Sequence, residues 1–191
     1  MNTIEILIEG YAQIKEKGWE ASGTTCLIST DSGMKIITDP GANRDLLLER
    51  LSGKGLTVGD IQMVFLTHHH LDHAMSVGIF PNAKVVDAEA IYTQDKAEEG
   101  VAMLPDTDIT ILPTPGHEAG HGILVVPTSQ GTVVVAGDNF WWTADEEQVL
   151  DLEKKDDFAE DMSVLIESRK KVLELADWVV PGHGKVFEVK K

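Results

Sequence analysis

The stretch FLTHHHLDHAMSVG, residues 65–78, concentrates four histidines and one aspartate into positions 68–73. Protonated imidazoles packed this closely would repel one another, and burying them without partners costs free energy. A divalent cation removes both difficulties, because neutral imidazole is a strong ligand for zinc and iron. The cluster lies inside the chain, which argues against a purification tag, and it therefore predicts a metal centre.

The other three histidines lie in two short regions farther along the chain, at His117, His121 and His183. His117 and His183 each follow an apolar run that predicts a strand, and Asp138 ends another such run, TVVVAGD. Loops at one edge of a sheet can bring together residues that are far apart in the sequence. We therefore expect these side chains to join the first cluster at one edge of a sheet.

The spacing of the donors predicts two metal ions. Side chains two positions apart point the same way in extended backbone, so His68 and His70 can reach one ion. Asp72 and His73 are adjacent and point differently, toward a neighbouring ion, and a catalytic zinc leaves one position to water. The predicted ligands are His68, His70 and His117 for the first ion, Asp72, His73 and His183 for the second, and Asp138 as a bridge between them.

The length and composition of the chain favour one globular domain over residues 1–191. Of its 191 residues, 42% are apolar and 25% are charged, and no repeat, low-complexity run or linker divides them. The opening run TIEILIEG predicts a strand with Ile4, Ile6 and Ile8 on one face. Further strands are expected within 24–30, 34–39, 61–67, 84–88, 108–114, 122–128, 132–138 and 177–189, and helices within 43–55 and 157–176.

The net charge of −16 argues against a broad nucleic-acid or anionic-membrane surface, because clustered lysines and arginines bind such partners. No segment approaches the roughly 20 apolar residues of a membrane span, and the first residues lack the features of a signal peptide. The single cysteine, Cys26, sits in an apolar run and cannot form an internal disulfide. We therefore expect a cytoplasmic protein with a structural cysteine, and a homodimer only because that is the commonest assembly.

Five short motifs in the chain resemble those of the metallo-β-lactamase-fold hydrolase superfamily. The run HHHLDH fits the superfamily pattern His-x-His-x-Asp-His, and the other motifs stand in the expected order. The carboxy-terminal part is also similar to the small single-domain metallo-β-lactamase domain-containing proteins. This resemblance implies an α/β fold, a four-layer αββα sandwich with a dinuclear centre at the edges of its two sheets. The motifs are TDPG (38–41), HHHLDH (68–73), TPGH (114–117), AGD (136–138) and PGHG (181–184).

The resemblance and the donor set together imply metal-dependent hydrolysis. Two divalent ions can share a water, lower its pKa from 15.7 toward about 7, and so supply a metal-bridging hydroxide as the nucleophile. Zinc is the first expectation for both ions, with iron and manganese as alternatives. Asp138 is expected to hold the ion pair, and Asp72 to bind one ion and handle a proton. The expected substrate is a small molecule with an ester, thioester, lactone or phosphodiester-type bond.

Aromatic residues near the predicted ligands are candidates for the substrate pocket. Phe140, Trp141 and Trp142 come shortly after the AGD motif, and they are predicted either to wall an apolar pocket or, equally, to belong to the core. Tyr11 and Trp19 lie between the first predicted strands, in a segment that borders the site in similar folds. For these two residues, a place in the core is the stronger expectation.

Three further residues accompany the predicted ligands without being ligands themselves. His69 occupies the variable position of the histidine motif, and we expect it to have an outer or surface role. His121 begins a predicted strand, where ordinary packing is the stronger expectation. Asp39 either holds a metal-bound imidazole from outside or serves as a turn residue, and the sequence does not separate these two interpretations.

Three other functions remain open from the sequence. A mononuclear iron dioxygenase of the persulfide dioxygenase type would use a subset of the same ligands. A nuclease of this fold that acts on a short or local RNA segment is the second, because the charge disfavours only wide phosphate contacts. A non-catalytic metal-binding or partner-binding module is the third, although such a module would not need all seven donors. Metal content and chelator-sensitive activity would separate these functions.

Overall fold

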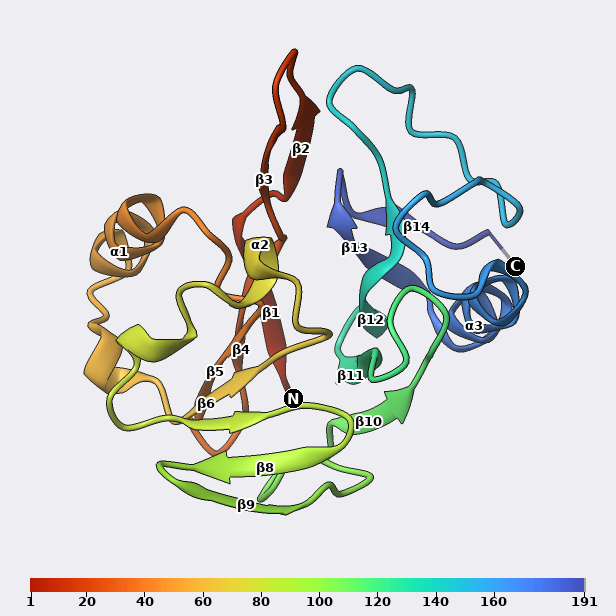
Figure 1. Cartoon of the computed structure of the whole chain (residues 1–191). Coiled ribbons are helices and arrows are strands. Elements are labelled where there is room, and N and C mark those ends of the chain that lie inside the picture. Colours follow the sequence, from red (N-terminus) through yellow and green to blue (C-terminus); the bar gives the residue numbers. More distant parts are fainter. Residues whose placement is uncertain (191) are drawn as a thin grey trace.

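Two β-sheets pack face to face in the structure, a computed structural model that describes residues 1–190 (Figure 1). Helix α1 (Arg44–Gly53) covers the outer face of one sheet, and helix α3 (Met162–Leu175) covers the outer face of the other. The layers follow the order helix, sheet, sheet, helix, which confirms the expected αββα sandwich. No helix in the described range combines the length and the hydrophobicity that crossing a bilayer requires.

The larger sheet takes in the amino-terminal half of the chain. In spatial order its strands are β1 (Thr3–Ile8), β4 (Thr25–Ser29), β5 (Lys35–Thr38), β6 (Met63–Phe65), β7 (Lys84–Val86), β8 (Ala90–Thr93) and β9 (Lys96–Glu99). Strands β5, β6 and β7 run parallel to one another, and the remaining neighbours are antiparallel. The central strands are apolar on both faces because α1 covers one face and the second sheet covers the other.

The smaller sheet takes in the carboxy-terminal half. In spatial order its strands are β10 (Thr110–Pro113), β11 (Gly122–Thr128), β12 (Gly131–Trp141), β13 (Trp178–His183) and β14 (Phe187–Glu188). Because side chains alternate along a strand, Val133 and Val135 of β12 face the other sheet. Their neighbours Val134 and Ala136 face α3 instead. Each sheet therefore shares the central core and also contributes to an outer core beneath its own helix.

Short elements at one end of the sandwich surround the predicted metal ligands. Strands β2 (Tyr11–Ile14) and β3 (Trp19–Ser22) form a hairpin that projects beyond the sheets, at the top of Figure 1. Helix α2 (Leu71–Ala74) is a single turn that follows β6. Two 3₁₀ turns, Val58–Asp60 and Val77–Ile79, complete the helical segments that the structure describes.

Three features of the described chain differ from the sequence prediction. Ile4, Ile6 and Ile8 do not share one buried face: Ile8 is 4% exposed and Ile6 is 37% exposed, because the pairing of β1 with β4 changes register between them. The helix expected within 157–176 begins only at Met162, where the Asp161 side chain accepts the first backbone N–H groups. The hairpins β2–β3 and β8–β9 are not predicted by the sequence at all.

Candidate metal centre

Seven potential metal donors from both sheets meet at the edge of the sandwich. The segments that carry them are far apart in the sequence, but the fold brings them together at this edge. The donors are His68 and His70 in the loop after β6, Asp72 and His73 on α2, His117 between β10 and β11, Asp138 within β12, and His183 at the end of β13. The structure thus brings together all seven residues that the sequence singles out; that they bind metal stays a prediction.

Asp138 lies inside β12 rather than at its end, and a local irregularity turns its carboxylate toward the other donors. Gly137 has a φ of 50°, and the pairing of β12 with β13 changes register on both sides of it. This left-handed conformation is costly for residues that carry a Cβ. On the neighbouring strand, a Cβ added to Gly182 would overlap the Asp138 carboxylate. Both glycines are therefore needed for the carboxylate to occupy its place.

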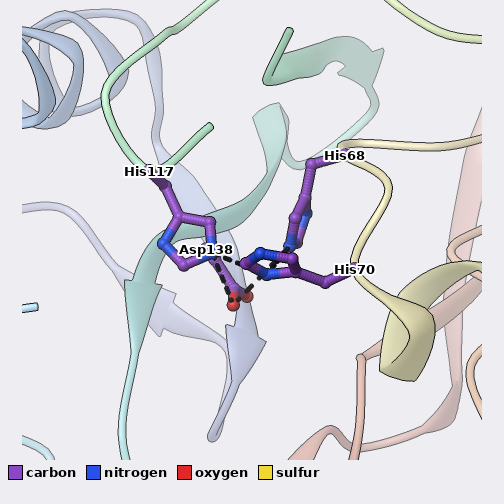
Figure 2. Close-up of side chains that lie close together, drawn as sticks. All are labelled: His68, His70, His117 and Asp138. Atoms are coloured by element: carbon purple, nitrogen blue, oxygen red, sulfur yellow. Dashed lines mark hydrogen bonds and ion pairs between the residues drawn. The ribbon is translucent and has the colours of Figure 1, made fainter. Parts of the chain in front are cut away.

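The first group of donors consists of His68, His70, His117 and Asp138, whose donor atoms lie within 4.8 Å of one another (Figure 2). The Nδ1 atom of His70 lies 3.1 Å from Nε2 of both His68 and His117. The Oδ2 atom of Asp138 lies 3.9 Å from His68 Nε2 and 3.5 Å from His117 Nε2. Three nitrogens and one carboxylate oxygen match the number and kind of donors that zinc takes.

The second group consists of Asp72, His73 and His183, and it shares Asp138 with the first group. The Nε2 atom of His183 lies 3.3 Å from both His73 Nε2 and Asp72 Oδ2. Asp138 places Oδ1 3.2 Å from His73 Nε2 and Oδ2 3.6 Å from His183 Nε2. The Asp138 carboxylate therefore contacts both groups, as a bridging ligand would.

An oxygen acceptor fixes the outer ring nitrogen of every histidine in the two groups. Carboxylate and carbonyl oxygens only accept hydrogen bonds, so the ring nitrogen that meets them must carry the proton. The Thr67 hydroxyl donates to Asp39, and it therefore accepts from its histidine as well. The partners are Thr67 Oγ1 for His68 (3.0 Å), Glu118 Oε1 for His70 (3.2 Å), Asp39 Oδ2 for His73 (3.0 Å), Asp156 Oδ2 for His117 (2.8 Å) and the Tyr11 carbonyl for His183 (3.1 Å).

This arrangement fits a pair of metal ions. With only the outer nitrogens protonated, as in the metal-bound state, the neutral rings would direct five lone pairs into the space that they share with two carboxylates. The Oδ1 atom of Asp138 is buried there and accepts no hydrogen bond, although His73 Nε2 is only 3.2 Å away. Lone pairs that converge in a buried space need a cation between them, and outer partners of this kind are typical of metal-bound histidines. Each donor group would hold one ion, with Asp138 reaching both.

Burial and neighbouring charges shift the pKa values of the donors in different directions. Burial lowers the pKa of His68 well below its ordinary value, and the charge on His73 acts the same way. Burial opposes ionisation of Asp138, but His73 and His183 hold the pKa of its carboxyl well below the usual range. Burial likewise lowers the pKa of His183, but Asp138 and Asp72 outweigh it and raise that pKa to about 9. A metal ion that enters the second group must therefore displace protons.

A cavity of about 770 Å³ opens from this centre, between the β2–β3 hairpin and the segment that follows β12. Five of the seven donors form its floor, and its walls are largely apolar. Tyr11 and Trp19, for which the core is the stronger expectation from sequence, line the cavity instead, and Trp19 is 70% exposed. The apolar wall residues include Ile14, Trp19, Leu71, Met75, Trp141 and Phe158.

Of the three aromatic residues predicted to bind substrate, only Trp141 lines this cavity. Phe140 and Trp142 are 2% and 5% exposed, and both pack against Phe187 in the outer core beneath α3. Of the two interpretations left open for Phe140 and Trp142, the place in the core is therefore correct and the pocket wall is not. The reason is strand alternation, which points these two side chains to the face opposite that of Trp141.

The three accompanying residues each have a defined place. His69 faces away from the centre, with Nε2 3.0 Å from Asp87 Oδ2 and its side chain 56% exposed. His121 is buried with Nδ1 3.0 Å from Thr114 Oγ1, and burial lowers its pKa to about 3, so it is neutral. Asp39 contacts a donor imidazole from outside, with Oδ2 3.0 Å from His73 Nδ1, and its backbone has a φ of 41°. This contact is the one that the first interpretation of Asp39 requires.

The sequence does not predict three of the outer partners, Thr67, Glu118 and Asp156. Thr67 adjoins its partner His68 in the sequence, and this adjacency is a usable signal. Glu118 adjoins His117 but contacts His70 instead, so its adjacency does not identify its partner. Asp156 offers no such signal, because it lies in the charged run KKDDF and reaches His117 only through the tertiary fold.

Arg169 of α3 links the segment that carries Asp156 to the strand that carries Asp138. It is 2% exposed, and its guanidinium donates to the backbone carbonyls of Asn139 (2.7 Å), Leu152 (2.9 Å) and Lys154 (2.7 Å). These three acceptors satisfy a buried cation that would otherwise be costly. Docking of α3 therefore helps to set the position of both carboxylates.

The fold and this donor set define a class of protein. A family model described as the metallo-beta-lactamase superfamily matches residues 20–107. The chain belongs to the metallo-β-lactamase superfamily of metal-dependent hydrolases. The resemblance indicated by the five sequence motifs is thereby confirmed.

Within this superfamily the chain is similar to metallo-beta-lactamase domain-containing protein 1 of Rattus norvegicus, with 32% identity over 98% of this chain and 87% of the relative. A Thermotoga maritima structure assigned to the metallo-beta-lactamases has a TM-score of 0.71 at 20% identity, covering 98% of this chain and 99% of its own. The dizinc quorum-quenching lactonase AidC has a TM-score of 0.65 at 17% identity, covering 87% and 74% of the two chains. At these identities the two solved structures show a shared fold.

Proposed function

We propose that this chain is a dinuclear metal-dependent hydrolase that acts on a small molecule with an ester, thioester, lactone or phosphodiester-type bond. The observation that carries the proposal is the pair of donor groups joined through one carboxylate, that of Asp138. Two divalent ions, with zinc as the first candidate, would supply an activated water and polarise the substrate oxygen. The cavity above the donors offers room for the substrate beside them.

The protein residues would hold this centre rigidly. Asp138 would keep the two ions at a fixed separation, because its two oxygens face different donor groups. The outer partners would keep each imidazole in the orientation and the protonation state that metal binding needs. A rigid donor set of this kind needs little reorganisation when charge develops on the substrate.

Asp72 would hold and move a proton. Its side chain is 22% exposed, its Oδ2 lies 3.3 Å from His183 Nε2, and it lines the cavity. Burial raises the pKa of Asp72, but the hydrogen bond with His183 and the charge of His73 outweigh this and lower it. The group is therefore ionised and faces the substrate, so it can accept a proton from water and return it to the leaving group.

Metal content and activity of Asp138→Ala test the proposal. We expect two ions per chain in the unaltered protein, and fewer ions with more than about a hundredfold loss of hydrolysis in the variant. His69→Ala is the matched control, because His69 faces Asp87 outside the centre, and it should keep both ions and its activity. One iron per chain with no hydrolysis would contradict the proposal and favour the persulfide dioxygenase alternative. Full activity of Asp138→Ala would also contradict it.

A further inference from the structure

The cavity above the metal centre has an unusual balance of charge and hydrophobicity. We propose that it selects an electrically neutral substrate with an extended apolar acyl group, and that it discriminates against substrates with carboxylate or phosphate groups beyond the bond that is cleaved. This inference rests on the proposed function and narrows it to neutral carboxylic esters, thioesters and lactones.

The first observation is the absence of cationic side chains from the cavity. Among the described residues that line it, none is lysine or arginine, whereas Glu20 on the hairpin adds a negative charge beside the two carboxylates of the floor. An anionic group that leaves water for this cavity would meet no charged donor away from the floor, so it would lose its hydration without compensation.

Two lysines near the walls do not change this conclusion, because both are already paired. Lys154 lies 4.4 Å from the centroid of the Trp141 ring, donates to the Trp141 carbonyl (3.1 Å) and pairs with Glu146 (3.4 Å). Lys15 on the hairpin pairs with Glu20 at 3.4 Å. Recruiting either lysine to a substrate anion would break contacts that it makes in the free protein.

The second observation is the concentration of exposed apolar side chains on the walls. Among the large apolar side chains that the structure describes, four of the five most exposed line this cavity. Exposed apolar area gathered in one place marks a binding surface, whereas scattered residues would not. These residues are Ile14 (75% exposed), Trp19 (70%), Leu71 (68%) and Met75 (59%).

The third observation is a row of aromatic rings that joins the two sides of the cavity. Phe158 lies with its ring centroid 6.3 Å from that of Trp19 on the hairpin and 5.8 Å from that of Trp141 on β12. The row begins at the floor, since the Trp141 ring also lies 6.4 Å from the donor ring of His183. An acyl chain whose carbonyl sits at the metal centre would therefore extend along aromatic and aliphatic surface.

A matched pair of thioesters tests this inference: S-octanoyl-N-acetylcysteamine, which is neutral, and S-octanoylglutathione, which carries carboxylates on the leaving group. Both contain the same scissile bond and the same acyl group. We expect kcat/KM to favour the neutral thioester by at least about tenfold. We also expect it to rise about threefold to fourfold per methylene from the acetyl to the octanoyl thioester of N-acetylcysteamine.

The outcomes of this test separate the two proposals. Equal rates on the two octanoyl thioesters, no dependence on acyl length, or faster cleavage of a short RNA than of any neutral ester would overturn the inference. If the protein with two bound metal ions hydrolyses none of these substrates, the result would instead contradict the proposed function.

Variants of the walls test the same inference from the side of the protein. Trp19→Ala should lower the ratio of octanoyl to acetyl activity by about tenfold, because it removes surface along the chain's path. Glu20→Lys should raise the activity on the glutathione thioester relative to the neutral one by about threefold to tenfold. Val149→Ala is the control, since Val149 is 56% exposed but lies outside the cavity, and it should change neither ratio. If Trp19→Ala leaves the ratio of octanoyl to acetyl activity unchanged, the acyl group does not bind along this wall.

Discussion

The floor and the walls of the cavity are built in opposite ways. On the floor and directly beneath it, the donor imidazoles are mostly buried, and each is held by a second contact to an oxygen outside the centre. On the walls, residues such as Ile14 and Trp19 are largely exposed. A metal site needs fixed donor positions, whereas an apolar pocket needs only surface. Metal binding and substrate choice can therefore vary independently in this fold.

The largest effect is expected on the floor, for Gly182→Ala. The added Cβ would overlap the Asp138 carboxylate, so the bridge between the two donor groups must move. We expect loss of at least one ion and more than about a hundredfold lower activity, measured by elemental analysis and steady-state kinetics. Gly53→Ala is the control, because an added Cβ at the end of α1 meets nothing within 4 Å. If the two variants have the same metal content and activity, the Asp138 carboxylate can shift without loss of the centre, which would contradict this prediction.

A smaller effect is expected for Asp156→Asn, which alters an outer partner without touching a donor. The amide keeps one acceptor oxygen but loses the charge that supports His117 across 2.8 Å. We expect affinity for the first ion to fall about 10-fold to 100-fold, measured by competition with a chelator. Asp157→Asn should leave the affinity unchanged, because that neighbouring side chain is 73% exposed and pairs with Lys155 at the surface. A large loss of metal affinity in Asp157→Asn would show that negative charge near the centre, and not the contact with His117, determines the affinity.

The pH dependence of stability should distinguish the metal-free floor from the metal-bound floor. Without metal, the pKa of His183 is raised from 6.5 to about 9. This stabilisation is complete below the unfolded value of 6.5 and is lost as pH rises through about 9. The metal-bound protein carries no such proton, so the Tm difference between loaded and chelator-treated protein should widen from pH 6.5 to 9.5. A constant or narrowing difference would contradict this pKa assignment.

The smallest effect is expected for Trp19→Ala, compared with Trp142→Ala by chemical denaturation. Trp19→Ala removes an exposed wall residue, and the free energy of unfolding should change by no more than about 0.5 kcal/mol. Trp142→Ala removes a residue that is 5% exposed, and should cost about 3–5 kcal/mol. If both variants destabilise the protein equally, the hairpin contributes to the fold more than its exposure suggests.

The sequence predicted the floor far better than the walls, and the reason is physical. Predicted metal ligands such as His68 and His70 must occupy fixed spacings, and those spacings can be read directly from the sequence. The walls form where the β2–β3 hairpin meets Phe158, and no local pattern encodes that contact. The choice left open at Phe140 could be settled by alternation along β12, which allows only one face of that strand to reach the cavity.

The spread of the donors along the chain has a consequence for how the protein matures. A nascent chain that has been synthesised only as far as α2 contains four of the donors but lacks the bridging carboxylate and the last imidazole. Arg169, which ties Asn139 to the segment before Asp156, is translated later still than that carboxylate. Under the proposed function, the complete donor set exists only once β13 has been synthesised, so both metal ions would bind a polypeptide in which the strands of both sheets that carry donors are already translated.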